Sequence, residues 1–335
     1  MHIMIIGGAG MVGAKLAKSL AGAGTLGDAP VDKLTLVDVV APRVELPDGP
    51  QVELREADLS DPKVAKSLVD LRPDVIYHLA AIVSGEAESD FDKGYRINLD
   101  GTRYLFDAIR HAHGQDGYRP RMIFTSSIAV FGAPFPDSIP DDYFRTPQTS
   151  YGTQKAISEL LLEDYTRRAF FDGLALRLPT ICIRPGKPNL AASGFFSNIL
   201  REPLAGQEAV LPVPDSVRHW HSSPRAVVRN LVRAGAMDLA PLGHRRSISL
   251  PGLSATVAEQ IEALRDVAGD KAVALIRSEP DETIQRIVAG WPQRFETARA
   301  RELGFSAESD FREIIAVHLE DELGTTVEDY RERQG

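Results

Sequence analysis

Residues 149–155 read TSYGTQK and place Tyr151 four residues before Lys155. On a helix this spacing puts both side chains on one face. A free tyrosine has a pKa of about 10, which is too high for a good base at neutral pH, and a neighbouring ammonium group favours the phenolate. The two residues could therefore form a general base and the cation that activates it. The same spacing also occurs in ordinary helices, so the interpretation depends on the surrounding motifs.

A serine pair precedes Tyr151 at the end of an apolar segment. The segment RMIFTSSI predicts a buried strand, and Ser127 lies 24 residues before Tyr151. In a doubly wound sheet, the carboxyl ends of the strands line the ligand crevice. Either Ser126 or Ser127 could hold the reacting oxygen of a substrate there. The alternative is a buried serine pair that satisfies the backbone.

The N-terminal segment IIGGAGMVG carries glycines at every third position, between an apolar strand and an alanine-rich helix. Such glycines allow a tight turn, a close approach of the backbone to a pyrophosphate and packing of the helix on the sheet. The N–H groups and the dipole at the helix start favour phosphate. This context predicts a dinucleotide site. We expect it to include Gly7, Gly10, Met11, Val12 and Gly13.

Two acidic residues follow the next predicted strands. Asp38 ends LTLVD, where a carboxylate can accept hydrogen bonds from the adenosine ribose and repel a 2′-phosphate, which favours NAD over NADP. It lies 25 residues after the last of these glycines, and the alternative is a solvated acid at a strand end. Asp58, followed by Leu59, could contact the adenine. A helix cap is the competing interpretation, because Ser60 and Asp61 are adjacent.

The composition is that of a globular protein, with 335 residues of which 43% are hydrophobic and 25% are charged. A net charge of −9 disfavours general binding of nucleic acid. The one cysteine, Cys182, excludes a disulfide framework and a multi-cysteine metal site, and we expect a buried thiol. The first residues predict a strand and not a signal peptide, and no apolar run could span a membrane. We therefore expect a cytoplasmic protein without a metal.

Apolar runs alternate with amphipathic segments in the first half of the chain, which predicts an α/β fold with a doubly wound parallel sheet. Strands are predicted at 1–7, 34–39, 52–59, 74–81, 121–128 and 174–181, and helices at 14–23, 63–71, 98–111 and 154–169.

From residue 179 the chain becomes rich in Pro and Gly and in shorter elements, including helices predicted at 224–236 and 257–268. We expect residues 1–178 to form a cofactor-binding domain. Residues 179–335 would form mainly a smaller substrate-binding cap, with a strand at 244–250 that returns to the main sheet.

The motifs GGAGMVG, DLSD, HLAA, NLDGT, SSIAVFG and YGTQK, together with Asp38, follow one another along the chain. In these motifs and their order, the chain resembles the extended short-chain dehydrogenase/reductases, specifically the NAD-dependent epimerase/dehydratase group. The resemblance is close over residues 1–185 and looser beyond. It implies a Rossmann-type fold, NAD as the cofactor and, because members often dimerise through helices, a homodimer.

By this resemblance, Ser127, Tyr151 and Lys155 are the catalytic residues, with Ser126 as an alternative substrate contact. Asn98 lies near the active site, and Lys155 also holds the nicotinamide ribose. The further cofactor contacts that the resemblance implies are Leu79, Ala80, Ala81, Pro179 and Thr180. His78 is expected to pack near the glycine turn without a chemical role.

The chain departs from the sugar-nucleotide epimerases after the sixth strand, where RLPTICIRPGKPN replaces their R-x-x-N-V-Y-G-P. It also lacks the Thr-Asp-Glu triplet of the dehydratases. A dehydrogenase needs only hydride transfer and the Tyr151 base. The segments RPGKPNLAASGFFSNILREPL and RHWHSSP resemble those of sugar-acid dehydrogenases of this family, and that resemblance implies NAD-dependent oxidation of the C2 hydroxyl of a small sugar acid. An epimerase that retains NAD and a non-catalytic dinucleotide sensor are the alternatives.

A sugar acid carries a carboxylate, which favours bidentate recognition by cations. Arg184, Lys187 and Arg218 are the candidates, and each could equally be a surface charge. His219 and His221 flank Trp220 beside Arg218 and could line a polar pocket, but two histidines do not make a metal site.

Overall fold

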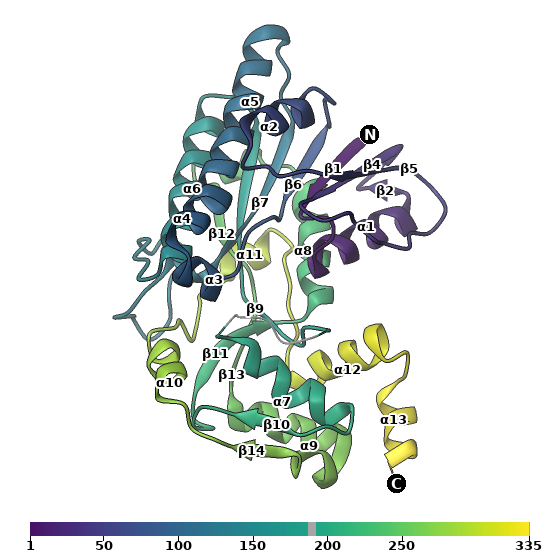
Figure 1. Cartoon of the computed structure of the whole chain (residues 1–335), viewed down its shortest axis with the longest axis vertical. Helices are drawn as coiled ribbons and strands as arrows, with labels where there is room; N and C mark the ends of the chain where they lie inside the picture. The colour runs from purple at the N-terminus through teal and green to yellow at the C-terminus, as the bar shows by residue number, and fades with distance from the viewer. Residues whose placement is uncertain (187–191, 335) are drawn as a thin grey trace. The chain divides into compact units, whose positions relative to one another are not determined.

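The computed structural model describes residues 1–186 and 192–334 (Figure 1). The chain divides into two compact units. The first unit contains residues 1–130, 147–178 and 228–250, and the second contains residues 131–146, 179–227 and 251–335. Among the described residues, no helix combines the length and the apolar character that crossing a membrane requires.

Seven parallel strands form the sheet of the first unit, which confirms the predicted doubly wound α/β architecture. From one edge to the other they are β12 (Ser247–Ser249), β8 (Asp172–Leu178), β7 (Arg121–Ser127), β6 (Val75–His78), β1 (His2–Ile6), β4 (Lys33–Asp38) and β5 (Gln51–Glu56). The order of the strands reverses between β1 and β6. Ligands of such sheets bind beyond the carboxyl ends of the strands at this switch point.

Helices cover both faces of this sheet. The helices α2 (Pro62–Val69), α5 (Gly101–Asp116) and α6 (Ser150–Arg167) lie on one face, and α1 (Met11–Ala23) lies on the other with the later part of α8 (Pro224–Ala236) (Figure 1). Apolar side chains alternate along the strands, so that Met4, Ile76 and Phe124 pack with Phe106 of α5 in one buried core.

Three helical segments begin earlier than the sequence predicts, and the first is α1, which begins at Met11 and not at residue 14. Ahead of the helix predicted from residue 98, residues without a predicted element form α3 (Ser84–Ser89) and α4 (Phe91–Gly94), and a π-helix runs from Tyr95 to Asp100. The helix predicted from residue 154 begins at Ser150, because the hydroxyl of Thr149 accepts a hydrogen bond from the N–H of Gly152 at 3.0 Å. Tyr151 therefore lies in the first turn of α6.

The second unit contains two small sheets. One has the order β13 (Leu253–Thr256), β11 (Arg218–Ser222), β9 (Thr180–Ile181), and the other pairs β10 (Ala209–Leu211) with β14 (Ile276–Ser278). The described helices that belong wholly to this unit are α7 (Gly194–Leu204), α9 (Val257–Val273), α10 (Glu282–Ala289), α11 (Ala298–Glu302), α12 (Phe311–Glu322) and α13 (Val327–Gln334).

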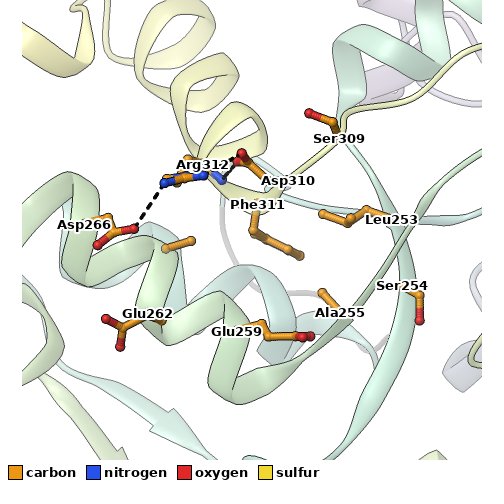
Figure 2. A pocket seen from close by; sticks show the side chains of 11 residues that line it. Leu253, Ser254, Ala255, Glu259, Glu262, Asp266, Ser309, Asp310, Phe311 and Arg312 are labelled. Atoms are coloured by element: carbon orange, nitrogen blue, oxygen red, sulfur yellow. Dashed lines mark hydrogen bonds and ion pairs between the residues drawn. The ribbon is translucent and has the colours of Figure 1, made fainter.

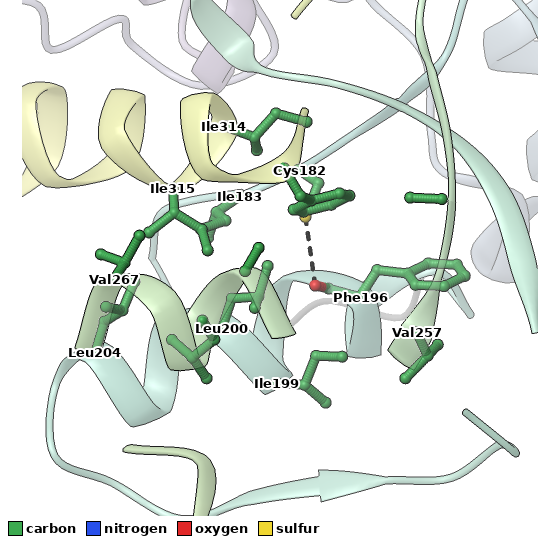
Figure 3. Packing of buried hydrophobic residues seen from close by; sticks show 14 of the residues in the cluster. Cys182, Ile183, Phe196, Ile199, Leu200, Leu204, Val257, Val267, Ile314 and Ile315 are labelled. Carbon is green, nitrogen blue, oxygen red and sulfur yellow. Dashed lines mark hydrogen bonds between the residues drawn. The ribbon is translucent and has the colours of Figure 1, made fainter. Parts of the chain in front are cut away.

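Cys182 lies in the apolar core of this second unit, as Figure 3 shows. Its side chain is fully buried, and its Sγ donates a hydrogen bond to the carbonyl oxygen of Phe196 at 3.3 Å. Burial raises the pKa of the thiol to about 12. The prediction of a buried thiol is confirmed, and at neutral pH this thiol is protonated.

Gly235 lets α8 pack directly on the sheet, because an added Cβ would lie 1.9 Å from the hydroxyl of Tyr77. We expect Gly235→Ala to lower the free energy of unfolding by about 1–3 kcal/mol through overpacking. Gly114→Ala in α5 is the control, since an added Cβ there meets nothing within 4 Å. It should stabilise the protein by about 0.5–1 kcal/mol. Chemical denaturation measures both, and equal effects would contradict the close packing.

Candidate active site and dinucleotide site

The glycine turn joins β1 to α1 through close backbone contacts. Gly7 has a φ of 96°, in the left-handed region that favours glycine, and a Cβ there would lie 2.8 Å from the N atom of Ala80. A Cβ on Gly13 would lie 2.1 Å from the carbonyl oxygen of Gly7. No other residue type fits these two positions without a shift of the backbone.

The start of α1 has the features of an anion site. Its N-cap is Gly10, which has no side chain to cap the helix. The N–H groups of the first turn, on Met11, Val12 and Gly13, have no partner within the helix, and the helix dipole adds a partial positive charge. These N–H groups could therefore hold a pyrophosphate.

Asp38 lies at the carboxyl end of β4, beside the glycine turn. Its carboxylate accepts hydrogen bonds from the N–H of Ala9 at 2.9 Å and from the N–H of Val39 at 2.8 Å. The first bond ties the acid to the turn itself. This arrangement suits an acid that receives a ribose next to a pyrophosphate.

Asp58 is not a helix cap. That role belongs to Asp61, which accepts from the N–H of Lys63 at the start of α2. Asp58 instead accepts from the N–H of Ser60 at 2.9 Å, and it pairs with Arg96 at 3.4 Å. Leu59 beside it is buried.

The segment Leu79–Ala80–Ala81 leaves the end of β6 along the glycine turn. The N–H of Leu79 donates to the carbonyl oxygen of Ile6 at 2.8 Å. Together with the contact between Gly7 and Ala80, this bond brings the ends of β1 and β6 together at the switch point. The side chain of His78, just before, is buried and hydrogen-bonded to Thr102 at 2.9 Å. Burial lowers its pKa to about 3, so the ring is neutral.

Tyr151 and Lys155 lie on one face of α6, as their spacing predicts. The Nζ atom of Lys155 is 5.7 Å from the centre of the Tyr151 ring and 4.6 Å from that of Phe124. It donates a hydrogen bond to the carbonyl oxygen of Thr125 at 2.8 Å. The side chain is buried, and burial lowers its pKa to about 7, against the opposing effect of the Glu159 carboxylate.

The two serines have different environments, which the sequence alone does not reveal. Ser126 is buried, and its hydroxyl donates to the carboxylate of Glu159 at 2.6 Å. Ser127 is half-buried, and its hydroxyl accepts from the N–H of Ala129 at 3.1 Å. A hydroxyl acceptor of this kind still has its own proton to donate. Ser127 is therefore better suited to hold a substrate oxygen.

Asn98 lies in the π-helix, a distortion that is often found at functional sites. Its side-chain oxygen accepts from the N–H of Ile82 at 2.9 Å, and its amide donates to Gln154 at 2.8 Å. Gln154 is buried next to Lys155 on α6. The sequence interpretation missed this residue, although its place within TSYGTQK was a signal.

Two further charged residues that we did not predict lie behind Lys155. Glu159 follows Lys155 by four residues, and Arg177 interrupts the otherwise apolar strand LALRLPTI. Arg177 was a readable signal, because a charge in a buried strand requires a partner. The structure pairs them at 2.8 Å, and neither side chain is more than 4% exposed.

Pro179 and Thr180 belong to the second unit, where Thr180 lies in β9. The hydroxyl of Thr180 is hydrogen-bonded to the Nε2 atom of His219 at 2.7 Å. His219 is buried, stacked on Phe196 and bonded to the carbonyl oxygen of Pro292 at 3.0 Å. Burial lowers the pKa of His219 to about 3, and it lowers that of the neighbouring His221 well below its usual value. These are neutral core residues.

The three candidate cations differ in their surroundings. Lys187 lies outside the described residues. Arg184 is held by the chain around it, since it donates to the carbonyl oxygen of Ile181 at 3.1 Å and to the hydroxyl of Ser193 at 3.0 Å. Arg218 donates to the carbonyl oxygen of Ser254 and pairs with Glu259 at 3.3 Å.

Arg218 also lines a cavity of about 370 Å³ in the second unit. The residues around it are Phe135, Pro136, Asp137, Ile139, Arg218, Gln293 and Arg294. Two guanidinium groups in one cavity favour an anion, and the carboxylate of Asp137 with the amide of Gln293 could bind hydroxyl groups.

A second cavity, of about 400 Å³, has the opposite character (Figure 2). Glu259, Glu262 and Asp266 line it, and its arginine, Arg312, is paired with Asp310 at 2.9 Å and with Asp266 at 3.6 Å. Such a lining repels a carboxylate. Within the ranges 1–186 and 192–334, no group of three or more His, Cys, Asp or Glu residues could hold a metal ion.

Residues 3–223 match the NAD dependent epimerase/dehydratase family. The chain belongs to this family. This match confirms the resemblance inferred from the motifs.

Two curated relatives are similar over nearly their full length. The D-erythronate dehydrogenase of Cupriavidus necator is 46% identical over 96% of this chain and 98% of its own. The D-erythronate dehydrogenase of Haemophilus influenzae is 43% identical over 96% and 99%.

Among solved structures, the nucleoside-diphosphate-sugar epimerase from Agrobacterium tumefaciens is 68% identical, with a TM-score of 0.95 over 98% of this chain and 96% of its own. An L-threonine dehydrogenase from Cupriavidus necator shares the fold at 23% identity, with a TM-score of 0.81 over 96% of this chain and 99% of its own.

The contact between Gly13 and Gly7 predicts that Gly13→Ala disrupts the dinucleotide site. The added Cβ would push the first turn of α1 away from β1 and displace the N–H groups there. We expect the dissociation constant for NAD to rise about 100-fold or more, since each 1.4 kcal/mol is tenfold. Calorimetric titration measures it. Gly22→Ala, later in the same helix, is the control, because an added Cβ there makes only an ordinary contact at 3.7 Å. Equal affinities of the two variants would contradict the prediction.

Proposed function

We propose that this protein is an NAD-dependent dehydrogenase that oxidises the C2 hydroxyl of D-erythronate to give 2-dehydro-D-erythronate. The observation that carries the proposal is the burial of the Lys155 ammonium beside Tyr151. This is the arrangement that a tyrosine base needs, and no further acid–base group is required for oxidation of an alcohol. The names of the two curated relatives support the choice of substrate.

Four residues of the first unit have separate roles in the proposed reaction. The phenolate of Tyr151 takes the proton of the C2 hydroxyl, and the hydroxyl of Ser127 donates a hydrogen bond to the same oxygen. Lys155 stabilises the phenolate, and Asn98 holds the backbone at Ile82 through its amide. Bound NAD supplies the oxidant, which accepts the hydride as the C2 alcohol becomes a ketone.

The residues of the glycine turn fit a dinucleotide, because glycine has no side chain and so leaves room for the pyrophosphate beside the N-terminus of α1. The position of Asp38 favours NAD over NADP, since a 2′-phosphate beside this carboxylate would be repelled. We assign the cofactor to the first unit and the selection of the acid to the second.

The epimerase name of the Agrobacterium tumefaciens structure makes a sugar-nucleotide epimerase the second candidate. Such an enzyme would retain its NAD and would not release NADH. The segment RLPTICIRPGKPN, which lacks the asparagine of the epimerase pattern, disfavours this reaction. A dinucleotide sensor without activity would have no need for a buried Lys155 beside Tyr151.

One assay separates these functions. The purified protein is mixed with NAD or NADP and with sugar acids of four to six carbons, and the absorbance of the reduced cofactor is followed. We expect reduction of NAD, fastest with D-erythronate, and much slower reduction of NADP. Turnover of a UDP-sugar in place of any acid would overturn the proposal.

Tyr151→Phe tests the base. We expect kcat to fall by a factor of about 100 to 10,000, the usual contribution of a general base. Tyr165→Phe on the same helix is the matched control, because its hydroxyl bonds to Asp107, away from Lys155. It should retain nearly full activity. Full activity in Tyr151→Phe would refute the mechanism while leaving the substrate assignment intact.

We propose Arg218 as the cation that binds the carboxylate, because it lines a cavity with a second arginine, Arg294. Arg218→Met should raise KM for D-erythronate about 10- to 100-fold, as expected for loss of a charged hydrogen bond. Arg225→Met is the control, since Arg225 pairs with Asp321 and Glu320 at the surface. An unchanged KM in Arg218→Met would exclude this residue.

A further inference from the structure

Three polar side chains from three elements meet behind Lys155. Glu159 of α6 accepts two hydrogen bonds from Arg177 of β8, from Nε to Oε1 at 2.9 Å and from Nη2 to Oε2 at 2.8 Å. Ser126 of β7 donates to the same Oε1 atom at 2.6 Å. The register of the sheet places Ser126 directly beside Arg177 on the neighbouring strand.

This cluster is buried to a degree that charged groups seldom reach. Glu159 is fully buried and the side chain of Arg177 is 4% exposed. Burial of such charges costs several kcal/mol for each ion and is tolerated when the pair is well bonded. The bidentate geometry and the serine bond keep Glu159 ionised. Their combined effect is to fix one negative charge one helical turn away from Lys155.

The groups that face Lys155 come from three elements. Tyr151 and Glu159 lie on its own helix, and β7 contributes the ring of Phe124 and the carbonyl oxygen of Thr125. From β6, His78 faces it, but its ring is neutral. Among the described residues, Glu159 is the carboxylate whose charge opposes the effect of burial on Lys155.

We propose that Glu159, held by Arg177 and Ser126, is a positioning residue that keeps Lys155 charged and in place behind Tyr151. Arg177 takes both carboxylate oxygens of Glu159, and Lys155 bonds to the carbonyl of Thr125. The carboxylate thus acts on Lys155 through space, with the ammonium 5.7 Å from the centre of the Tyr151 ring. Ser126 accordingly belongs to this cluster and not to the substrate site.

The proposal rests on the proposed function, in which Lys155 activates Tyr151, and it has a specific consequence for the dependence of activity on pH. Loss of the negative charge at Glu159 destabilises the ammonium of Lys155. Tyr151 and Lys155 together then lose their protons at lower pH. A smaller fraction of the molecules has the Tyr151 phenolate and the Lys155 ammonium at the same time. Both limbs of the pH profile of kcat should therefore move to lower pH, and the maximum should fall.

Glu159→Gln tests this, since glutamine keeps the shape and can still accept from Ser126. We expect both limbs to move by about one pH unit, the lower end of the effect of a nearby charge, and the maximal kcat to fall about tenfold or more. The matched control is Glu163→Gln on the same helix, whose carboxylate also accepts from a serine, Ser247, at 2.8 Å. Its pH profile should match that of the wild type.

Glu159→Gln leaves Arg177 buried without its counter-ion, so the double variant Glu159→Gln/Arg177→Gln serves as a second test that keeps the charge balance. It should show the same acid shift, because the carboxylate beside Lys155 is missing there too. Melting temperatures and NAD affinities of all variants show whether each is folded.

The outcomes separate the two proposals. A wild-type pH profile in a folded Glu159→Gln or double variant would overturn the role of Glu159, whereas a strong loss in Tyr151→Phe would still support the function. A uniform loss of kcat without any shift of the limbs would assign Glu159 a merely structural role. No reduction of NAD by the wild type with any sugar acid would overturn both proposals.

Discussion

The active site depends on placing one ammonium group, that of Lys155, where water cannot reach it. Burial lowers the pKa of Lys155. It also strengthens the electrostatic effect of the ammonium on Tyr151, because the protein interior screens charges less than water does. A lysine in this position needs fixed partners, because an unpaired buried charge is expensive. The carbonyl oxygen of Thr125, the ring of Phe124 and the charge of Glu159 provide them.

Phe124 and Thr125 belong to β7 and are distant from Lys155 in sequence, so the fold itself sets much of the electrostatics. The helix α6 reaches the end of β7 because Thr149 caps it and because Gly152 has no Cβ, which would lie 2.1 Å from the carbonyl oxygen of Ala129. The parallel register then brings Arg177 beside Ser126. A change in these contacts would move α6 relative to the strand β7, which supplies the contacts of the Lys155 ammonium.

The dinucleotide site follows from the same topology. The glycine turn after β1 and the segment after β6 touch because the strand order reverses between them. Asp38 reaches the turn from the end of β4 through its bond to Ala9. The neighbouring strands β6, β1 and β4 thus all contribute to the dinucleotide site at their carboxyl ends. The local sequence motif after each strand already indicated its role.

By itself, the sequence determined the architecture, the family and the residues of the local motifs. Periodic apolar runs, glycine spacing and the four-residue step from Tyr151 to Lys155 are properties of neighbouring residues, and local geometry acts on them directly. The helix starts were less predictable, because a single capping bond at Thr149 and a π-helix around Asn98 moved them. Only the tertiary structure decided which serine faces Glu159, and that Arg177 and Gln154 stand behind the active-site residues. It also decided that Arg218 shares a cavity with Arg294. Those facts concern residues that are far apart along the chain, and only the pairing of strands and the packing of helices bring them within reach of a hydrogen bond or of a shared ligand.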